Sequence, residues 1–128
     1  MKKEEGRKDL KVRTKEFALQ IIHLYSALPK TTEAQVLGNQ LIRSGTSVGA
    51  HYREAQRAKS DADFVNKIEG ALQELDETVY WLELLRDSKF VAMEKLSSII
   101  KESDELLAIF VSIVKTVKSR KKEEDKKV

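Results

Sequence analysis

Apolar side chains recur every three or four positions over four long stretches of this chain, and this spacing constrains the fold most. The clearest stripe comprises Phe64, Ile68, Ala71, Leu72, Leu75, Val79 and Leu82. Such a spacing places the side chains on one face of an α-helix. One proline and five glycines in 128 residues leave little material for a loop-rich β fold. We therefore expect an all-α chain.

Helix-breaking and capping residues between the stripes set the expected helix ends. Pro29 should close the first helix, because the residue before a proline is pushed out of the α region. Thr32 with Gln35 is typical of a capping box, and Ser60 before Asp61 of a second N-cap. These signals predict a single domain over 1–128, with helices at 8–28, 33–58, 61–87 and 91–118 and a frayed basic tail at 119–128. Long helices with short joints favour an antiparallel up-down-up-down four-helix bundle.

Composition and charge narrow the class of protein. Without cysteine there is no disulfide framework or thiolate metal site, which fits a cytoplasmic protein. The charged N-terminus does not resemble a secretory signal, and no apolar run is long enough to span a bilayer. The net charge of +3 is uneven: residues 60–88 hold two basic and eight acidic side chains, whereas 118–128 hold six and three. A basic patch is therefore more plausible than a uniformly basic coat.

Catalytic and metal-binding patterns are absent from the sequence. A di-iron bundle needs Glu-x-x-His, but Gln20 precedes His23 and Val48 precedes His51 at that spacing. Ser47 lies four residues before His51, yet no Gly-x-Ser-x-Gly elbow presents a nucleophile. We expect no enzyme activity, no metal and no cofactor.

Small residues interrupt the second expected helix. Its positions Ser44, Gly45, Ser47 and Gly49 should weaken a helix relative to alanine. Close packing against another helix would offset this loss, and a ligand contact is the alternative explanation.

Apolar residues also extend beside the main stripes of the last two helices. These are Trp81, Leu84, Ile99, Leu106 and Ile113, the last three at intervals of seven. Either the buried face is broad, or these side chains form a second seam against another subunit. The seam predicts a homo-oligomer.

The segment from Gln40 to Ala50 carries a family resemblance, with the Arg-Ser-x-x-Ser centre at its middle. Together with Arg53-Glu54-Ala55, Ala71-Leu72-Gln73-Glu74 and Tyr80-Trp81-Leu82-Glu83-Leu84-Leu85, it resembles the bacterial four-helix bundle proteins encoded in intervening sequences of 23S ribosomal RNA genes. Many members read Asn-Ile-x-Glu-Gly, where this chain keeps Glu54 but has Ala55 in place of the glycine. The resemblance implies a ring-shaped homopentamer. It also implies kinship with an accessory protein of diversity-generating retroelements, which binds reverse transcriptase and nucleic acid.

Two functional hypotheses follow. The first is a nucleic-acid-binding protein, with RNA as the expected ligand. Its phosphate-binding residues would be Arg43, Arg53, Arg57, Lys59, Lys118, Arg120, Lys121 and Lys122. The second is a ring-shaped scaffold or accessory subunit, whose acidic segment 60–88 binds a basic protein that processes nucleic acid.

Overall fold

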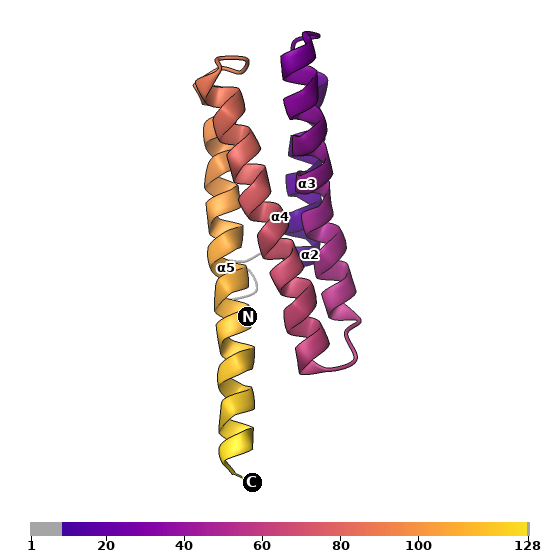
Figure 1. The fold of residues 1–128 in the computed structure, drawn as a ribbon, viewed down its shortest axis with the longest axis vertical. Coiled ribbons are helices and arrows are strands. Elements are labelled where there is room, and N and C mark those ends of the chain that lie inside the picture. The colour runs from indigo at the N-terminus through magenta and orange to yellow at the C-terminus, as the bar shows by residue number, and fades with distance from the viewer. Residues whose placement is uncertain (1–8, 128) are drawn as a thin grey trace.

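The structure is a computed structural model that describes residues 9–127 of the chain. Four α-helices follow one another: α2 (Leu10–Ser26), α3 (Thr32–Gln56), α4 (Asp61–Asp87) and α5 (Met93–Lys126). Residues 9–127 contain no strand. The fold is the predicted all-α four-helix bundle, drawn in Figure 1.

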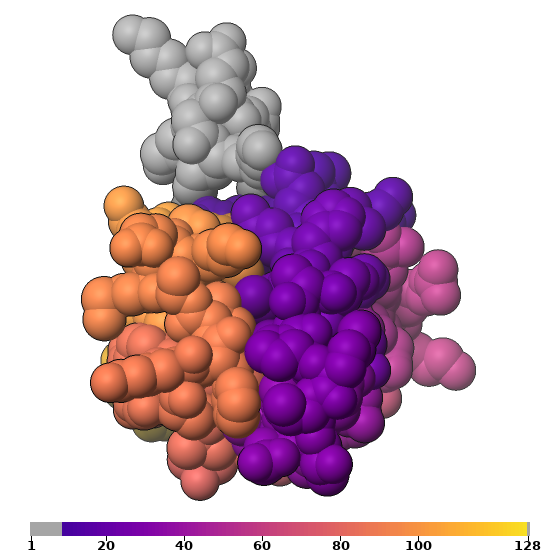
Figure 2. Space-filling view, turned by 90° about the horizontal axis from the view of Figure 1, so that it is seen from above, coloured from indigo at the N-terminus to yellow at the C-terminus, as the bar shows by residue number. Residues whose placement is uncertain are grey.

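The helices run up and down along one long axis. The α2–α3 turn and the α4–α5 loop lie at one end, and the α3–α4 turn lies at the other, where α5 continues past the rest of the bundle (Figure 1). Viewed along that axis, α2 lies beside α5 (Figure 2). Arg13 of α2 joins this pair by binding Glu102 and Glu105 of α5, each at 2.7 Å. The hydrogen bond to Glu102 raises the pKa of Arg13, so the charge is fixed.

Side-chain caps begin α2, α3 and α4, whereas α5 begins without one. Ser60 caps α4 as predicted, because its hydroxyl accepts from the Asp63 amide. The capping residue of α3 was predicted one position too late. Thr31, not Thr32, accepts from the amide of Ala34 at 3.3 Å. Adjacent threonines offer two equivalent hydroxyls, and only the backbone geometry selects between them.

The core is formed by side chains from all four helices. Its fully buried large members are Phe17, Ile21, Leu41, Val48, Ile68, Leu75, Leu82, Leu85, Leu96, Leu106 and Phe110. On α5 the buried positions are Leu96, Ile99, Ser103, Leu106, Phe110, Val114 and Val117. These positions follow a heptad spacing of three and four, so Ile99 and Leu106 belong to the same buried seam as Leu96 and Phe110. The prediction of an outer seam is therefore wrong for Ile99 and Leu106.

Helix α5 ends eight residues later than predicted, since it continues to Lys126 where an end near 118 was expected. The extension has no apolar face, but it consists mostly of strong helix formers. Lys121 and Asp125 add an ion pair at 3.8 Å with the favourable i,i+4 spacing. Residues 118–126 thus form a regular helix with exposed side chains rather than a frayed tail.

Two of the small residues of α3, Gly45 and Gly49, lie against α2. A Cβ added at Gly45 would lie 2.8 Å from Cγ1 of Ile21, and one added at Gly49 would lie 3.1 Å from Oγ1 of Thr14. Glycine is required at Gly45 because Ile21 is completely buried and has no space to move. Close helix packing thus accounts for the two glycines of the segment.

Candidate nucleic-acid interface

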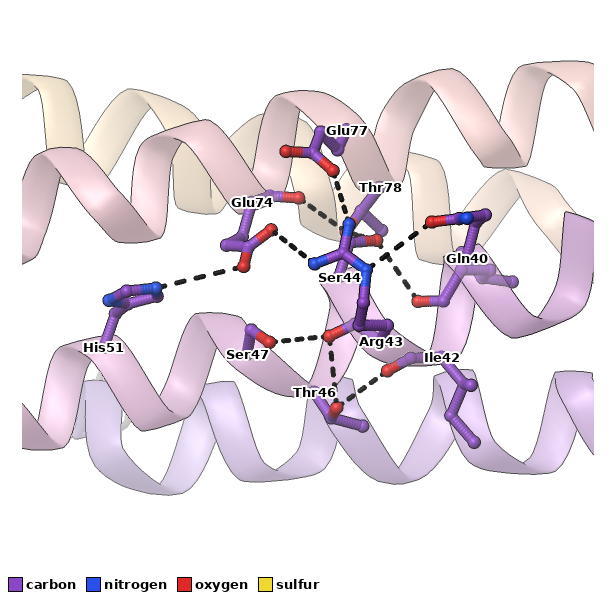
Figure 3. Close-up of polar contacts among 11 residues, drawn as sticks. Gln40, Ile42, Arg43, Ser44, Thr46, Ser47, His51, Glu74, Glu77 and Thr78 are labelled. Atoms are coloured by element: carbon purple, nitrogen blue, oxygen red, sulfur yellow. Dashed lines mark hydrogen bonds and ion pairs between the residues drawn. The ribbon is translucent and has the colours of Figure 1, made fainter.

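In a polar cluster between α3 and α4, the predicted phosphate ligand Arg43 is paired with two carboxylates (Figure 3). Its guanidinium donates to Glu77 at 2.6 Å, and a second nitrogen lies 3.6 Å from Glu74. The side chain of Glu74 is only 14% exposed. Because two carboxylates already neutralise Arg43, its contribution to an anion site is small.

In the same cluster, Ser47 and His51 contact different partners. Ser47 donates to the carbonyl oxygen of Arg43 at 2.7 Å, and His51 Nε2 lies 3.9 Å from Glu74. The structure therefore shows no nucleophile–base pair between them. The hydroxyl oxygens of Ser44 and Thr78 lie 2.9 Å apart, so they bridge α3 and α4 in the buried interior. Within residues 9–127, no group of three or more His, Asp or Glu side chains is placed to hold a metal ion.

Five of the remaining predicted basic residues lie at one end of the bundle, where the α3–α4 turn meets the C-terminal half of α5. The other two, Arg53 and Arg57 near the end of α3, line neither of the hollows found there. Two hollows lie there. The first is lined by Lys59 and Arg120, with Phe64 and Ile113 among its apolar members. The second is lined by Lys118, Lys121 and Lys122, with Val65 and Glu69. Ser60, Asp61 and Val117 line both hollows, so the two adjoin. We call this region the basic end.

Most cations of the basic end are free to bind anions. Lys118 lies 3.3 Å from Glu69, and Lys121 lies 3.8 Å from Asp125, but all four side chains are at least half exposed. Exposed pairs of this kind contribute little and exchange readily. Within residues 9–127 the other basic residues have no ion-pair partner and are exposed: Arg53, Arg57, Lys59, Arg120 and Lys122.

Exposed apolar side chains form a stripe on α2 that was not predicted from the sequence. Val12, Leu19 and Ile22 on α2 are 47%, 44% and 37% exposed. The predicted interface residues Trp81 and Ile113 are half-buried against the core, and Leu84 is half-buried. The spacing of seven and three from Val12 to Ile22 is a helical signal, so a search of the first helix for a second face would have found this stripe.

Comparison with known proteins agrees with this architecture. The family model described as 23S rRNA-intervening sequence protein matches residues 8–112. The chain belongs to this family. The predicted family resemblance is thereby confirmed, and the matched residues include α2, α3, α4 and more than half of α5. The last turns of α5, with Lys118 to Lys122, lie beyond the match.

A solved structure provides a second comparison. It is described as a protein of unknown function from the S23 ribosomal protein family of Bacteroides thetaiotaomicron. It is 43% identical to this chain, with a TM-score of 0.79, and the alignment covers 84% of this chain and 99% of that one. No similar sequence was found among curated proteins. None of the helices within residues 9–127 has the length and apolar character needed to cross a membrane.

Proposed function

We propose that this member of the 23S rRNA-intervening sequence protein family is a non-catalytic protein that binds RNA through the basic end. One observation carries the proposal. Lys59 in the α3–α4 turn and Arg120 in α5 line the same hollow, although they are far apart in the sequence. Lys118, Lys121 and Lys122 line the adjoining hollow. Such a group of mostly unpaired cations supplies the electrostatic contact that phosphates require.

The geometry of α5 supports the same ligand. Its last turns extend past the α3–α4 turn, so they can reach a large ligand without a clash with the rest of the bundle (Figure 1). The family is named for an intervening sequence of 23S ribosomal RNA, and the solved relative is described as belonging to a ribosomal protein family. A structured ribosomal RNA fragment is therefore the natural first probe.

A salt titration tests the proposal. Each phosphate contact releases counterions, so the logarithm of affinity should fall steeply and linearly with the logarithm of salt concentration. The triple substitution Arg57→Ala, Lys59→Ala and Lys122→Ala should reduce the slope by about 2 to 3, at roughly 0.7 to 0.9 per contact. Filter binding of a 23S ribosomal RNA fragment measures both quantities.

A matched triple variant serves as the control. Lys89, Lys95 and Lys101 are exposed cations in the α4–α5 loop and the first turns of α5, away from the basic end. Their replacement by alanine should leave the salt slope unchanged. If RNA is not retained even at low salt, the proposal is wrong.

A second candidate function is a homo-oligomeric scaffold or accessory subunit, and two surfaces favour it. The exposed stripe Val12, Leu19 and Ile22 is suited to a second copy of the chain, which by family resemblance would give a ring of five. Asp76, Tyr80 and Glu83 lie on the outer face of α4, and within residues 9–127 neither carboxylate has an ion-pair partner. That acidic face suits a basic protein partner. The molar mass in solution tests this candidate first.

A further inference from the structure

The two hollows of the basic end form one pattern of charge, with cations at the edges and a carboxylate between them. Lys59 comes from the α3–α4 turn, and Lys118, Lys121 and Lys122 come from α5. Asp61 lines both hollows and is exposed. No hydrogen bond or ion pair to its carboxylate occurs among residues 9–127. A phosphate that approaches Asp61 is repelled, so phosphates are directed to the two basic edges.

Within residues 9–127 the exposed aromatic side chain lies elsewhere, and the one aromatic residue that lines the basic end is the partly buried Phe64. Single-stranded nucleic acid is usually held by aromatic rings on which its bases stack. Among residues 9–127 the one exposed aromatic side chain is Tyr80, at 54%. It lies nineteen positions along α4 from Asp61, about 28 Å away at 1.5 Å per residue. Phe64 lines one hollow but packs against the core, and Tyr52 stacks on Phe110 at 5.9 Å. Among residues 9–127, the basic end therefore offers one partly buried ring rather than an exposed aromatic platform.

We infer that the ligand of the basic end is double-stranded RNA, held across its minor groove with Asp61 facing the 2′-hydroxyls. This inference rests on the function proposed above. The minor groove of A-form RNA is wide and shallow, displays 2′-hydroxyl groups and is bordered by the phosphates of both strands. Lys59 on one edge and Lys118 and Lys122 on the other would each contact one phosphate strand. The Asp61 carboxylate, an acceptor without a partner, would accept a hydrogen bond from a 2′-hydroxyl.

Duplex DNA fits the same surface poorly. The major groove of B-DNA admits an α-helix, so the extension of α5 is the element that would enter it. However, Glu123, Glu124 and Asp125 directly follow the basic residues and would then lie among the phosphates. B-DNA also has no 2′-hydroxyl to pair with Asp61.

Four probes of one sequence test the inference on the full chain. They are an RNA duplex of about 20 base pairs, the DNA duplex, and the two single strands of the RNA. Fluorescence anisotropy at fixed salt should show the RNA duplex bound about tenfold more tightly than either single strand or the DNA duplex.

Substitutions at Asp61 then isolate the 2′-hydroxyl contact. Asp61→Ala should reduce the preference for RNA duplex over DNA duplex about five- to tenfold, because the acceptor is lost. Asp61→Asn should keep the preference, since an amide oxygen also accepts. Asp104→Ala removes an exposed carboxylate from the other half of α5 and should leave the ratio unchanged. Ser60 still caps α4 in every variant, so the fold should persist, which circular dichroism can check.

Each outcome tests either the inference or the proposed function. Equal binding of the single strands, or of the DNA duplex, overturns the inference while the proposed function stands. An unchanged RNA-to-DNA ratio in Asp61→Ala also overturns it. If no probe binds at low salt, the proposed function itself fails, and the inference fails with it.

Discussion

At the scale of single residues, Gly45 and Gly70 show why the surroundings of a helical glycine determine its effect. Both lie in helices, where alanine would be favoured by about 1 kcal/mol. An added Cβ at Gly45 meets Cγ1 of the buried Ile21 at 2.8 Å, whereas at Gly70 it meets the ring of His51 at 2.9 Å. Ile21 cannot move, but His51 is partly exposed and can rotate away.

The contrast gives a paired stability prediction. Gly45→Ala should lower the free energy of unfolding by about 1 to 2 kcal/mol, because overpacking outweighs the gain in helix propensity. Gly70→Ala should be neutral or stabilise by up to about 1 kcal/mol. Urea denaturation of both variants measures the difference. A Gly45→Ala protein at least as stable as the wild type would show that α2 and α3 are not packed this closely.

The sequence predicted the identity of the small residues in α3 but not their partners. Gly45 and Gly49 are recognisable because two glycines four apart are unfavourable in a helix without a packing reason. Which neighbour occupies the space depends on the rotation and offset of α2, and no residue spacing in α3 encodes those. Gly38 was not singled out, although a Cβ there would lie 2.6 Å from Leu28.

At the scale of helices, a charged contact joins α3 to α4. It is made by Arg43, which was predicted to bind nucleic acid. Arg43→Ala should lower the melting temperature by a few degrees, since it leaves the largely buried Glu74 without its cation. The loss should shrink at high salt, because Arg43 itself is half exposed. Thermal denaturation at two salt concentrations measures the change.

The same variant distinguishes a structural from a binding role. The slope of RNA affinity against salt should remain that of the wild type in Arg43→Ala, whereas Arg57→Ala should reduce it by about 0.7 to 0.9. A reduced slope in Arg43→Ala would return this residue to the binding surface.

The positions of the helices were predictable because the apolar period is long and regular. The ends of the helices were less predictable. The predicted ranges of α3 and α4 differ from the observed ones by two residues or fewer. The end of α5 was misplaced because the prediction required an apolar face, while helix propensity and the pair of Lys121 with Asp125 suffice for the extension. Ile99 and Leu106 of α5 were assigned to an outer seam because the two alternating positions of a heptad repeat look like two independent stripes.

At the scale of the whole molecule, the basic end depends on the up-and-down topology. Residues 59–61 and 117–122 adjoin because an antiparallel bundle returns α5 to the level of the α3–α4 turn. The sequence predicted that topology and most of the basic residues involved. It did not predict the two hollows or the place of Asp61 between the basic edges, because these depend on the length and rotation of α5.

The outer face of α2 provides the last prediction at this scale. An exposed apolar stripe of this kind is costly for an isolated chain and is covered when subunits associate. The double substitution Leu19→Glu and Ile22→Glu should therefore reduce the molar mass in solution to that of one chain. Since both side chains are exposed, the fold of the single chain should persist. Light scattering gives the mass, and circular dichroism gives the helix content.

A matched change on other faces tests whether the stripe itself is responsible. Val36 of α3 and Met93 of α5 are 55% and 65% exposed, more than either α2 residue, and they do not belong to the stripe. Val36→Glu with Met93→Glu should leave the mass unchanged. If the wild-type protein is already a single chain, the scaffold function loses its basis, while RNA binding at the basic end still stands. If the wild type is an oligomer that both double variants leave intact, a surface other than α2 joins the subunits.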